Sequence, residues 1–314
     1  MKIVILDYAT IENGDLLPLN EISSHITTFD NTHQSQVVER CNGFDVVITN
    51  KVIINQDALS KLNTVKLICI AATGTNNVDL VAAKQQDIAV TNVAGYSTAS
   101  VVQHTFALLF NLLGNTHKYI ADCKNGQWQQ AQHFCFLDHP INEVAGLKMA
   151  LIGYGDLGSA VAKAASAFGI EVLISERKNS PVREGRVAFE EALKHGDIIS
   201  IHCPLNDDTK NLISTNEFAL MKPNAVLINT ARGGIVNESA LANALIHKKI
   251  AGAATDVLSK EPAEDSNPLI QYKGNNLLLT PHIAWASRQS ISRLIQQIAL
   301  NIEAFQVGQI RNRV

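Results

Sequence analysis

Short apolar runs recur along the first 95 residues and again after residue 146, and stretches with helical periodicity separate most of them. Several runs are apolar at every position, which is typical of parallel strands buried on both faces. The strand candidates are residues 3–6, 26–29, 46–49, 67–71 and 89–91, then 149–152, 172–174, 198–201, 225–228, 252–254 and 277–279. This pattern predicts an α/β fold with two Rossmann-like or flavodoxin-like domains, each a doubly wound parallel sheet, and a binding cleft between them.

Two longer helical patterns frame the second group of strands. Residues 97–113 are largely apolar and predict a helix that crosses from the first domain to the second. Residues 287–305 carry five apolar side chains on one side and predict a helix that returns to the first domain. Between these patterns, residues 115–143 are rich in Gln, His and aromatic residues, and we expect an irregular arm used in subunit contact.

Three glycines, Gly153, Gly155 and Gly158, follow the apolar run 149–152 and precede a helical pattern and a second strand. Gly153 permits the tight turn, Gly155 lets a pyrophosphate approach the backbone, and Gly158 lets helix and strand pack closely. The helix N-terminus offers free N–H groups and a positive dipole end to phosphates. Glu176 stands at the tip of the second strand, where an acid accepts hydrogen bonds from ribose hydroxyls. Together these features predict a dinucleotide site rather than a structural turn without ligand.

Composition narrows the class of protein. The 314 residues are enough for about two domains, and 46% of them are hydrophobic. The net charge of −3 and the lack of a basic cluster argue against nucleic acid as a partner. No segment reaches the roughly 18 uninterrupted apolar residues of a membrane helix, and the first residues make a poor signal peptide. The five scattered cysteines form no Cys-x-x-Cys pair, so we expect free thiols in a reducing cytoplasm.

Candidate chemistry lies in three stretches, each at the end of a predicted strand, where an open α/β sheet places its ligands. Arg232 is followed by two glycines, and its planar guanidinium can make a bidentate pair of hydrogen bonds with a carboxylate. The second stretch supplies Asp256 and Glu261, and the third supplies His282. A His beside a carboxylate is a general acid–base whose protonated form the negative neighbour favours. A lone His is more often structural, but the combination with Arg232 and Glu261 favours catalysis.

These stretches resemble the D-isomer-specific 2-hydroxyacid dehydrogenases, and the resemblance covers nearly the whole chain. The motifs that carry it are residues 153–158, 202–205 with Thr209, 229–238, 256–262 and 281–287. Residues 48–51, 134–135 and 284–287 are most similar to glycerate dehydrogenases, also called hydroxypyruvate reductases. The resemblance implies a homodimer. It also implies a discontinuous substrate domain, residues 1–95 with 287–314, and an NAD-binding domain, residues 96–286, that includes the arm at 115–143.

The resemblance also assigns site residues. It implies that Arg232, Glu261 and His282 are catalytic. It implies cofactor contacts from Gly153, Gly155, Asp156, Leu157, Gly158, Glu176, Cys203, Pro204, Thr209, Thr230, Ala231, Asp256, His282 and Ala284. Substrate contacts are implied for Lys51, Thr73, Gly74, Thr75, Arg232 and Trp285, with the backbone of the 73–75 loop binding an anion as a nest does. The acid at Glu176 favours NAD, while the adjacent Arg177 and Lys178 leave room for NADP.

The expected reaction is reversible hydride transfer between NADH and hydroxypyruvate, with glyoxylate as a second substrate and His282 as acid–base. Three alternatives stay open. One is another D-2-hydroxyacid dehydrogenase, of the lactate or phosphoglycerate type. The second is a nicotinamide-sensing corepressor or binding protein, and the third is a structural or interaction protein with vestigial nucleotide binding. Residues 133–139 hold two His, a Cys and an Asp, but their spacing fits no standard zinc motif, so no metal is expected.

Overall fold

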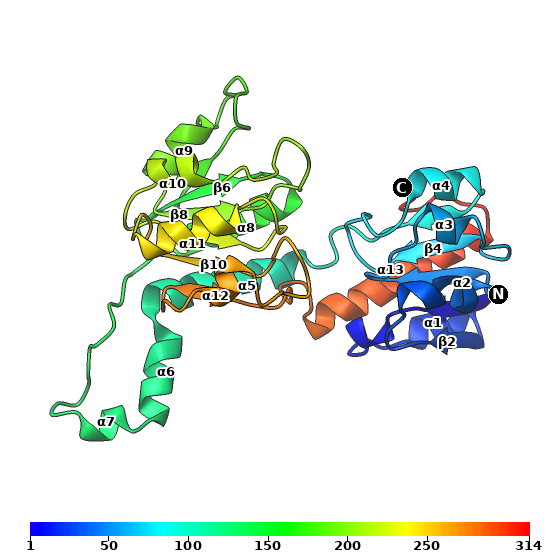
Figure 1. Ribbon diagram of the computed structural model, residues 1–314, viewed down its shortest axis with the longest axis horizontal. Coiled ribbons are helices and arrows are strands. Elements are labelled where there is room, and N and C mark those ends of the chain that lie inside the picture. Colours follow the sequence, from blue (N-terminus) through cyan, green and yellow to red (C-terminus); the bar gives the residue numbers. More distant parts are fainter. The chain divides into compact units, whose positions relative to one another are not determined.

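The computed structural model describes residues 1–314, which form two compact units (Figure 1). Unit 1 comprises Met1–Ser97 and Ala286–Val314, and unit 2 comprises Thr98–Trp285. Both units are α/β, and each contains one parallel sheet, which confirms the predicted fold class. Every predicted strand is present with its ends within one residue of the expected positions.

Unit 1 has a five-stranded parallel sheet in the order β2-β1-β3-β4-β5, the flavodoxin-like order. Its strands are β1 (Lys2–Ile5), β2 (His25–Thr28), β3 (Val46–Thr49), β4 (Leu67–Ile70) and β5 (Ala89–Thr91). Its helices are α1 (Leu17–Ile22), α2 (Val37–Cys41), α3 (Gln56–Leu59), α4 (Leu80–Gln85) and α13 (Arg288–Gln306). The strands β3, β4 and β5 are buried at every position, as their continuous apolar runs predict.

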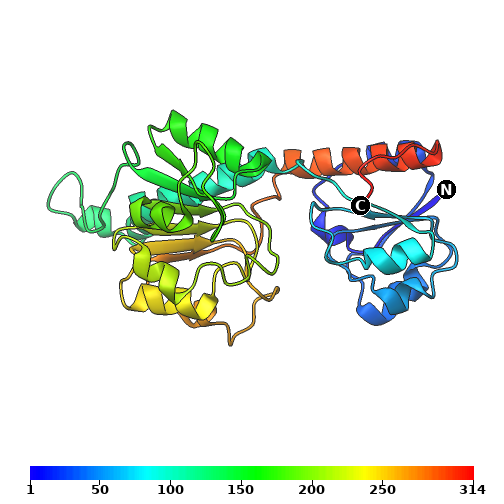
Figure 2. The same ribbon diagram turned by 90° about the horizontal axis from the view of Figure 1, so that it is seen from above.

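The long helix α13 belongs to unit 1 although it lies near the C-terminus of the chain (Figure 2). Its apolar residues recur at helical spacing, and Ile291, Leu294, Ile295, Ile298 and Ile302 are all buried. This face packs against α1 and β4. The side chain of Ser287 caps the helix N-terminus by accepting a hydrogen bond from Ser290 N. Burial of this face therefore joins the end of the chain to its beginning.

Unit 2 has a six-stranded parallel sheet in the order β11-β10-β9-β8-β6-β7. Its strands are β6 (Lys148–Ile152), β7 (Glu171–Ile174), β8 (Ile198–Ile201), β9 (Val226–Asn229), β10 (Gly252–Thr255) and β11 (Leu277–Leu279). An isolated parallel bridge joins Ser175 to Val187 beyond the end of β7. If that bridge is counted as a short strand, the order within the unit becomes 3-2-1-4-5-6-7, a Rossmann order with one added strand.

Helices cover both faces of this sheet, which explains why its central strands are apolar throughout. One face carries α9 (Phe189–His195), α10 (Thr215–Leu220), α11 (Glu238–Ile246) and α12 (Pro268–Gln271). The other face carries α5 (Thr98–Gly114) and α8 (Asp156–Ala167). Phe189, Phe218 and Leu241 pack into the first core, and Leu109 and Val161 pack into the second. No helix of the chain is both long enough and apolar enough to cross a membrane.

The expectation of an irregular arm at residues 115–143 is wrong for its first half. Helices α6 (Thr116–Lys124) and α7 (Gln127–Gln130) form there, and both views show them extending away from the sheet of unit 2 (Figures 1 and 2). Neither helix has a buried residue. Because no apolar stripe is buried, the periodicity that reveals most helices is missing from this stretch.

Candidate active site

The glycine turn after β6 has the geometry that its three glycines require. Gly153 has a φ of +101°, and a Cβ there would lie 2.6 Å from the backbone nitrogen of Cys203. A Cβ on Gly158 would collide with the carbonyl oxygen of Gly153. A Cβ on Gly155, by contrast, would meet no atom within 4 Å. The glycine at 155 is therefore not needed for packing, and its open side is where a pyrophosphate could approach the backbone.

Helix α8 begins directly after this turn, with Gly155 as its N-cap. Asp156 and Leu157 form its first turn, and both have solvent-accessible surface. The twelve-residue helix directs free N–H groups and a positive dipole end toward the turn. The open position at Gly155 and the helix N-terminus together fit a dinucleotide.

Glu176 lies just beyond β7, and an ion pair covers its carboxylate. Arg183 donates from Nε to Oε2 at 2.6 Å and from Nη2 to Oε1 at 2.7 Å. The backbone N–H of Arg177 also donates to Oε1, at 2.9 Å. The Glu176 side chain is only 2% exposed because Arg183 lies over it, while Arg183 itself is 59% exposed. The Arg183 hydrogen bonds, followed by that of Arg177, lower the pKa of Glu176 to about 2, so the group is a carboxylate at neutral pH.

The loop after β8 carries three predicted cofactor contacts. Burial raises the pKa of the Cys203 thiol to about 11, which keeps it protonated and unreactive at neutral pH. Thr209 donates its hydroxyl to the carbonyl of Pro204 at 2.7 Å, and the same hydroxyl accepts from the N–H of Asn206. The Thr209 side chain thus closes the turn that presents Pro204.

The loop after β9 holds Arg232 through backbone contacts. Asn229 accepts from the N–H of Ala231 and donates to the carbonyl of Arg232 at 2.9 Å. The Arg232 guanidinium donates to the carbonyl of Ala231 at 2.7 Å, which turns the side chain back over its own loop. Thr230 is buried, and its hydroxyl lies 3.1 Å from that of Thr105 on α5.

A close backbone contact joins the Arg232 loop to the loop that follows β10. A Cβ on Gly233 would collide with the backbone of Leu258 and Ser259. Only glycine allows this approach, so the second glycine-rich motif has a packing role beside its chemistry. Leu258 in turn donates its N–H to the Glu261 carboxylate at 2.9 Å. The contact at Gly233 therefore connects the Arg232 loop to the segment that orients Glu261.

Asp256 organises the loop that follows β11. Its carboxylate accepts from the Thr280 hydroxyl at 2.6 Å and from the N–H groups of Ile283 and Ala284 at 2.9 and 2.8 Å. His104 of α5 lies 3.5 Å away. Burial by itself raises the pKa of Asp256, but the hydrogen bonds from these groups outweigh it and the net pKa is lowered. Asp256 is 1% exposed, and its hydrogen bonds fix the loop that follows β11. Its contact with the cofactor stays a prediction.

His282 and Glu261 form a direct pair. Nδ1 of His282 lies 2.6 Å from Oε2 of Glu261. The His282 backbone has a φ of 55°, in the left-handed region that few non-glycine residues adopt, and its N–H donates to the carbonyl of Asp256 at 2.8 Å. Trp285 donates its indole N–H to the carbonyl of His282 at 2.9 Å. These contacts hold the His282 backbone in this conformation and fix the position of its ring beside Glu261.

The remaining predicted substrate residues, Lys51, Thr73, Gly74 and Thr75, lie in unit 1. Lys51 follows β3, and its N–H donates to buried Asp7 at 2.6 Å, as do those of neighbouring residues 50 and 52. Burial raises the pKa of Asp7 despite these bonds. The Thr73 hydroxyl donates to a backbone carbonyl at 2.9 Å, and the Thr75 carbonyl accepts from Val78 in a turn. Both loops follow the carboxyl ends of strands, β3 and β4.

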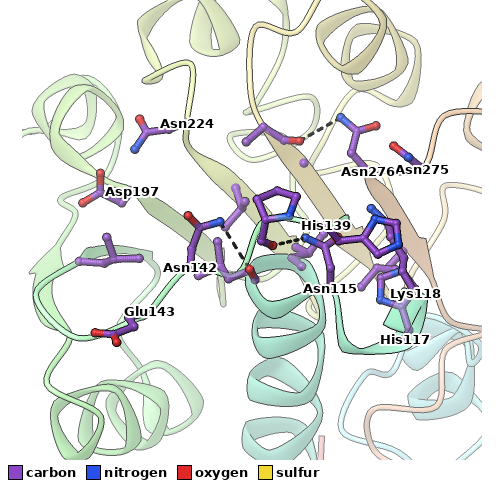
Figure 3. A pocket seen from close by; sticks show the side chains of 18 of the residues that line it. Asn115, His117, Lys118, His139, Asn142, Glu143, Asp197, Asn224, Asn275 and Asn276 are labelled. Carbon is purple, nitrogen blue, oxygen red and sulfur yellow. Dashed lines mark hydrogen bonds between the residues drawn. The ribbon is translucent and has the colours of Figure 1, made fainter. Parts of the chain in front are cut away.

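Unit 2 also contains a pocket away from these residues. A pocket of about 550 Å³ forms where the arm passes the amino ends of β9, β10 and β11, with Asn115, His117, His139 and Asn276 among its lining residues (Figure 3). The predicted site residues of unit 2 lie at the carboxyl ends of its strands, which is the opposite edge of the same sheet. His139 of the arm pairs with Asp122 at 2.7 Å, and no group of three potential metal ligands occurs in the chain.

Comparison with known proteins identifies the family. Residues 106–284 match the family model described as D-isomer specific 2-hydroxyacid dehydrogenase, NAD binding domain. The chain belongs to this family. A putative 2-hydroxyacid dehydrogenase of Haemophilus influenzae is 43% identical over 97% of this chain and 98% of its own. A glycerate dehydrogenase of Methylorubrum extorquens is 41% identical over 89% of this chain and 88% of its own.

A solved structure is similar over the entire chain. An acyclic imino acid reductase in complex with NADPH and D-Arg is 28% identical, with a TM-score of 0.84 and full coverage of both chains. The family model and the glycerate dehydrogenase relative make the protein a D-2-hydroxyacid dehydrogenase similar to glycerate dehydrogenases, and the family's NAD-binding domain lies in unit 2.

Several residues that shape this dehydrogenase's site had no role in the sequence analysis. Arg183 and Arg186 face Glu176 from a loop with no recognisable pattern. His104 lies within the apolar pattern of α5, yet its ring lies 3.5 Å from the Asp256 carboxylate. Gly233 was visible as part of an Arg-Gly-Gly run, and its contact with Leu258 is the reason for that run. Only the last of these carried a signal in the sequence.

Proposed function

We propose that this enzyme reduces hydroxypyruvate to D-glycerate with NADH, and glyoxylate to glycolate more slowly. The observation that supports it best is the pair formed by His282 and Glu261, in which Nδ1 lies 2.6 Å from Oε2. The backbone N–H of His282 donates to the carbonyl of Asp256 and holds the histidine in place. A histidine held by a carboxylate is an acid–base group suited to a carbonyl oxygen. The relative named glycerate dehydrogenase supports the choice of oxo acid.

Proton transfer falls to His282. Glu261 occupies the Nδ1 side of the ring, so the proton for the substrate oxygen comes from Nε2. When bound, the reduced nicotinamide supplies a hydride to the carbonyl carbon. The two additions together convert the 2-oxo acid into the 2-hydroxy acid, and the histidine leaves the step neutral. Glu261 stabilises the imidazolium before the transfer and keeps the ring oriented, because Leu258 holds its other oxygen.

Arg232 holds the substrate carboxylate in this proposal. In the structure its guanidinium donates from Nη1 to the Ala231 carbonyl, and its other N–H groups can donate to a carboxylate in a charge-assisted pair. Lys51 and the 73–75 loop are proposed as further contacts to the substrate, and Trp285 as a wall that selects its side chain. For the cofactor, we propose contacts from the glycine turn with Asp156 and Leu157, and from Glu176, Cys203, Pro204, Thr209, Thr230, Ala231, Asp256, His282 and Ala284.

The test is a parallel assay of hydroxypyruvate, glyoxylate, pyruvate and 3-phosphohydroxypyruvate, followed by the loss of NADH absorbance. Highest kcat/KM with hydroxypyruvate supports the proposal. Faster turnover of pyruvate or of the phosphorylated acid assigns the enzyme to the lactate or phosphoglycerate type. If NADH binds but no oxo acid is reduced, the catalytic part of the proposal is wrong and a sensing role is favoured.

We also propose that the arm joins two copies of the chain into a homodimer. Phe134, Leu137 and Ile141 of the arm are 90%, 74% and 62% exposed, and Trp128 is 57% exposed. Exposed apolar side chains gathered on one segment are typical of an interaction surface. Light scattering after size exclusion is expected to show a dimer, and Phe134→Ser combined with Leu137→Ser is expected to give monomers. A wild-type monomer at micromolar concentration contradicts the proposal.

For location, we propose the cytoplasm. All five cysteines are free, and two of them, Cys41 and Cys69, are buried as thiols. Thiols of this kind persist in a reducing compartment. Fractionation of cells that express the natural protein tests it, and recovery of the enzyme outside the cytoplasm contradicts it.

A further inference from the structure

The carboxylate of Glu176 has little capacity left for a ribose. Its Oε1 accepts from Arg183 Nη2 and from the Arg177 N–H, and its Oε2 accepts from Arg183 Nε. A carboxylate oxygen has about two lone-pair positions, so only one position, on Oε2, stays open. A two-point bond to the 2′- and 3′-hydroxyls of an adenosine ribose therefore requires Arg183 to move away.

The surroundings of Glu176 are basic as a whole. Besides Arg183, the Nε atom of Arg186 lies 3.8 Å from Oε2, and the exposed side chain of Arg177 begins at the neighbouring residue. Lys178 is not part of this group, because its ammonium pairs with Glu217 at 2.8 Å. The guanidinium groups of Arg183 and Arg186 thus both lie within 4 Å of one carboxylate, and these three groups carry a net charge of about +1 at neutral pH.

The backbone keeps these arginines in place. Glu176 donates its N–H to the carbonyl of Val187 at 2.8 Å, and Val187 donates to the carbonyl of Ile174 at 2.9 Å. The bridge between Ser175 and Val187 completes this short parallel pairing. The segment that carries Arg183 and Arg186 is therefore held beside the tip of β7, while the Arg183 side chain is 59% exposed and has room to change rotamer when its bonds to Glu176 break.

We propose that Arg183 is the residue that sets cofactor specificity, and that with Arg186 it binds a 2′-phosphate so that the enzyme uses NADP(H) as well as NAD(H). With NAD, Arg183 swings outward and Glu176 accepts from the 2′-hydroxyl. With NADP, Arg183 stays, neutralises Glu176 and donates to the phosphate. Without the guanidinium, Glu176 would repel the phosphate, because like charges at this distance disfavour each other. The inference concerns the cofactor site and holds for whichever oxo acid is reduced.

Calorimetric titration with NADP⁺ and NAD⁺ tests it without any turnover. The wild type is expected to bind both with dissociation constants within about tenfold of each other. Arg183→Ala is expected to weaken NADP⁺ binding by about 10- to 100-fold and to leave NAD⁺ binding unchanged or tighter. Lys249→Ala, which removes one exposed positive charge after α11, is the matched control and is expected to change neither affinity.

Two results would overturn the inference. One is a wild type that binds NADP⁺ more than about 100-fold more weakly than NAD⁺. The other is an equal loss of both affinities in Arg183→Ala, which would show a purely structural role. Arg183→Lys keeps the charge but lacks the fork, so an intermediate NADP⁺ affinity is expected, and KM values for NADPH and NADH should follow the same order. Calorimetry measures cofactor binding directly, so the NADP⁺ and NAD⁺ affinities can be interpreted even if the enzyme does not reduce hydroxypyruvate.

Discussion

The Nδ1 atom of His282 lies 2.6 Å from Oε2 of Glu261, although 20 residues separate them in the chain. Backbone hydrogen bonds hold both residues in place. Leu258 donates to the second oxygen of Glu261, and the N–H of His282 donates to the carbonyl of Asp256. The pair is therefore positioned before any substrate arrives, which is the arrangement that a proton donor requires.

Replacement of the proton donor gives the most direct test of this pair. His282→Ala is expected to lower kcat by about 100- to 10,000-fold, the usual contribution of a general acid. The affinity for NADH, measured by fluorescence titration, should stay close to that of the wild type. His195→Ala, on an exposed histidine of α9, is the control and should keep full activity. Near-normal turnover of the His282 variant would contradict the role.

Glu261 is expected to act through His282. Glu261→Gln keeps an oxygen near Nδ1 but removes the negative charge, so the protonated ring loses a charge-assisted bond. A loss of about 1.5–3 kcal/mol in stabilising that form corresponds to roughly a 10- to 100-fold lower kcat. KM for the cofactor and the melting temperature should hardly change. A variant that instead loses NADH affinity in proportion would show that Glu261 belongs to the binding site alone.

Two glycines of the same turn are expected to fail in different ways when replaced by alanine. A methyl group on Gly155 enters open space, so Gly155→Ala should fold as the wild type does and bind NADH at least about tenfold more weakly. A methyl group on Gly158 meets the carbonyl of Gly153, so Gly158→Ala should lower the melting temperature. Differential scanning calorimetry and NADH titration of both variants separate the effects. Normal NADH affinity in Gly155→Ala would mean that the pyrophosphate does not approach there.

The pH dependence of stability follows from the Glu176–Arg183 pair. The folded pKa of Glu176 is about 2, below its ordinary value of 4.5. A lowered folded pKa stabilises the native state above the ordinary value, and this contribution is lost as the pH falls from 4.5 toward 2. The urea midpoints of the wild type and Glu176→Gln should therefore differ more at pH 7 than at about pH 3.5. The difference between the two urea midpoints should also become smaller in high salt, because Arg183 is exposed and salt screens its attraction to Glu176.

A neighbouring acid supplies the control for that experiment. Glu184→Gln alters an exposed carboxylate on the same segment, and its midpoint is expected to follow the wild type at both pH values. A gap between wild type and Glu176→Gln that stays constant from pH 7 to about pH 3.5 would be inconsistent with ionisation of Glu176 as its cause.

The sequence by itself determined the strands of both sheets and the turn between β6 and α8. Buried parallel strands must be apolar at every position, and a tight turn over a helix N-terminus must use glycine, so both leave direct marks in the chain. Helices α5 and α13 were visible for the same reason, since each buries an apolar face. The polar helix α6 buries nothing, and its sequence gave no sign of it.

Only the tertiary structure decided which groups meet. The fold brings Arg183 over Glu176, His104 beside Asp256, and the backbone of Leu258 against Gly233. The last two contacts join different loops and helices, the first lies within the loop that follows β7, and no local pattern encodes any of them. Charge and hydrogen bonding act over a few ångströms in space rather than along the chain, so the state of Glu176 and the hold on Glu261 depend on the fold. The sequence alone predicts the acid Glu176 at the tip of β7, and only the structure shows that Arg183 pairs with it.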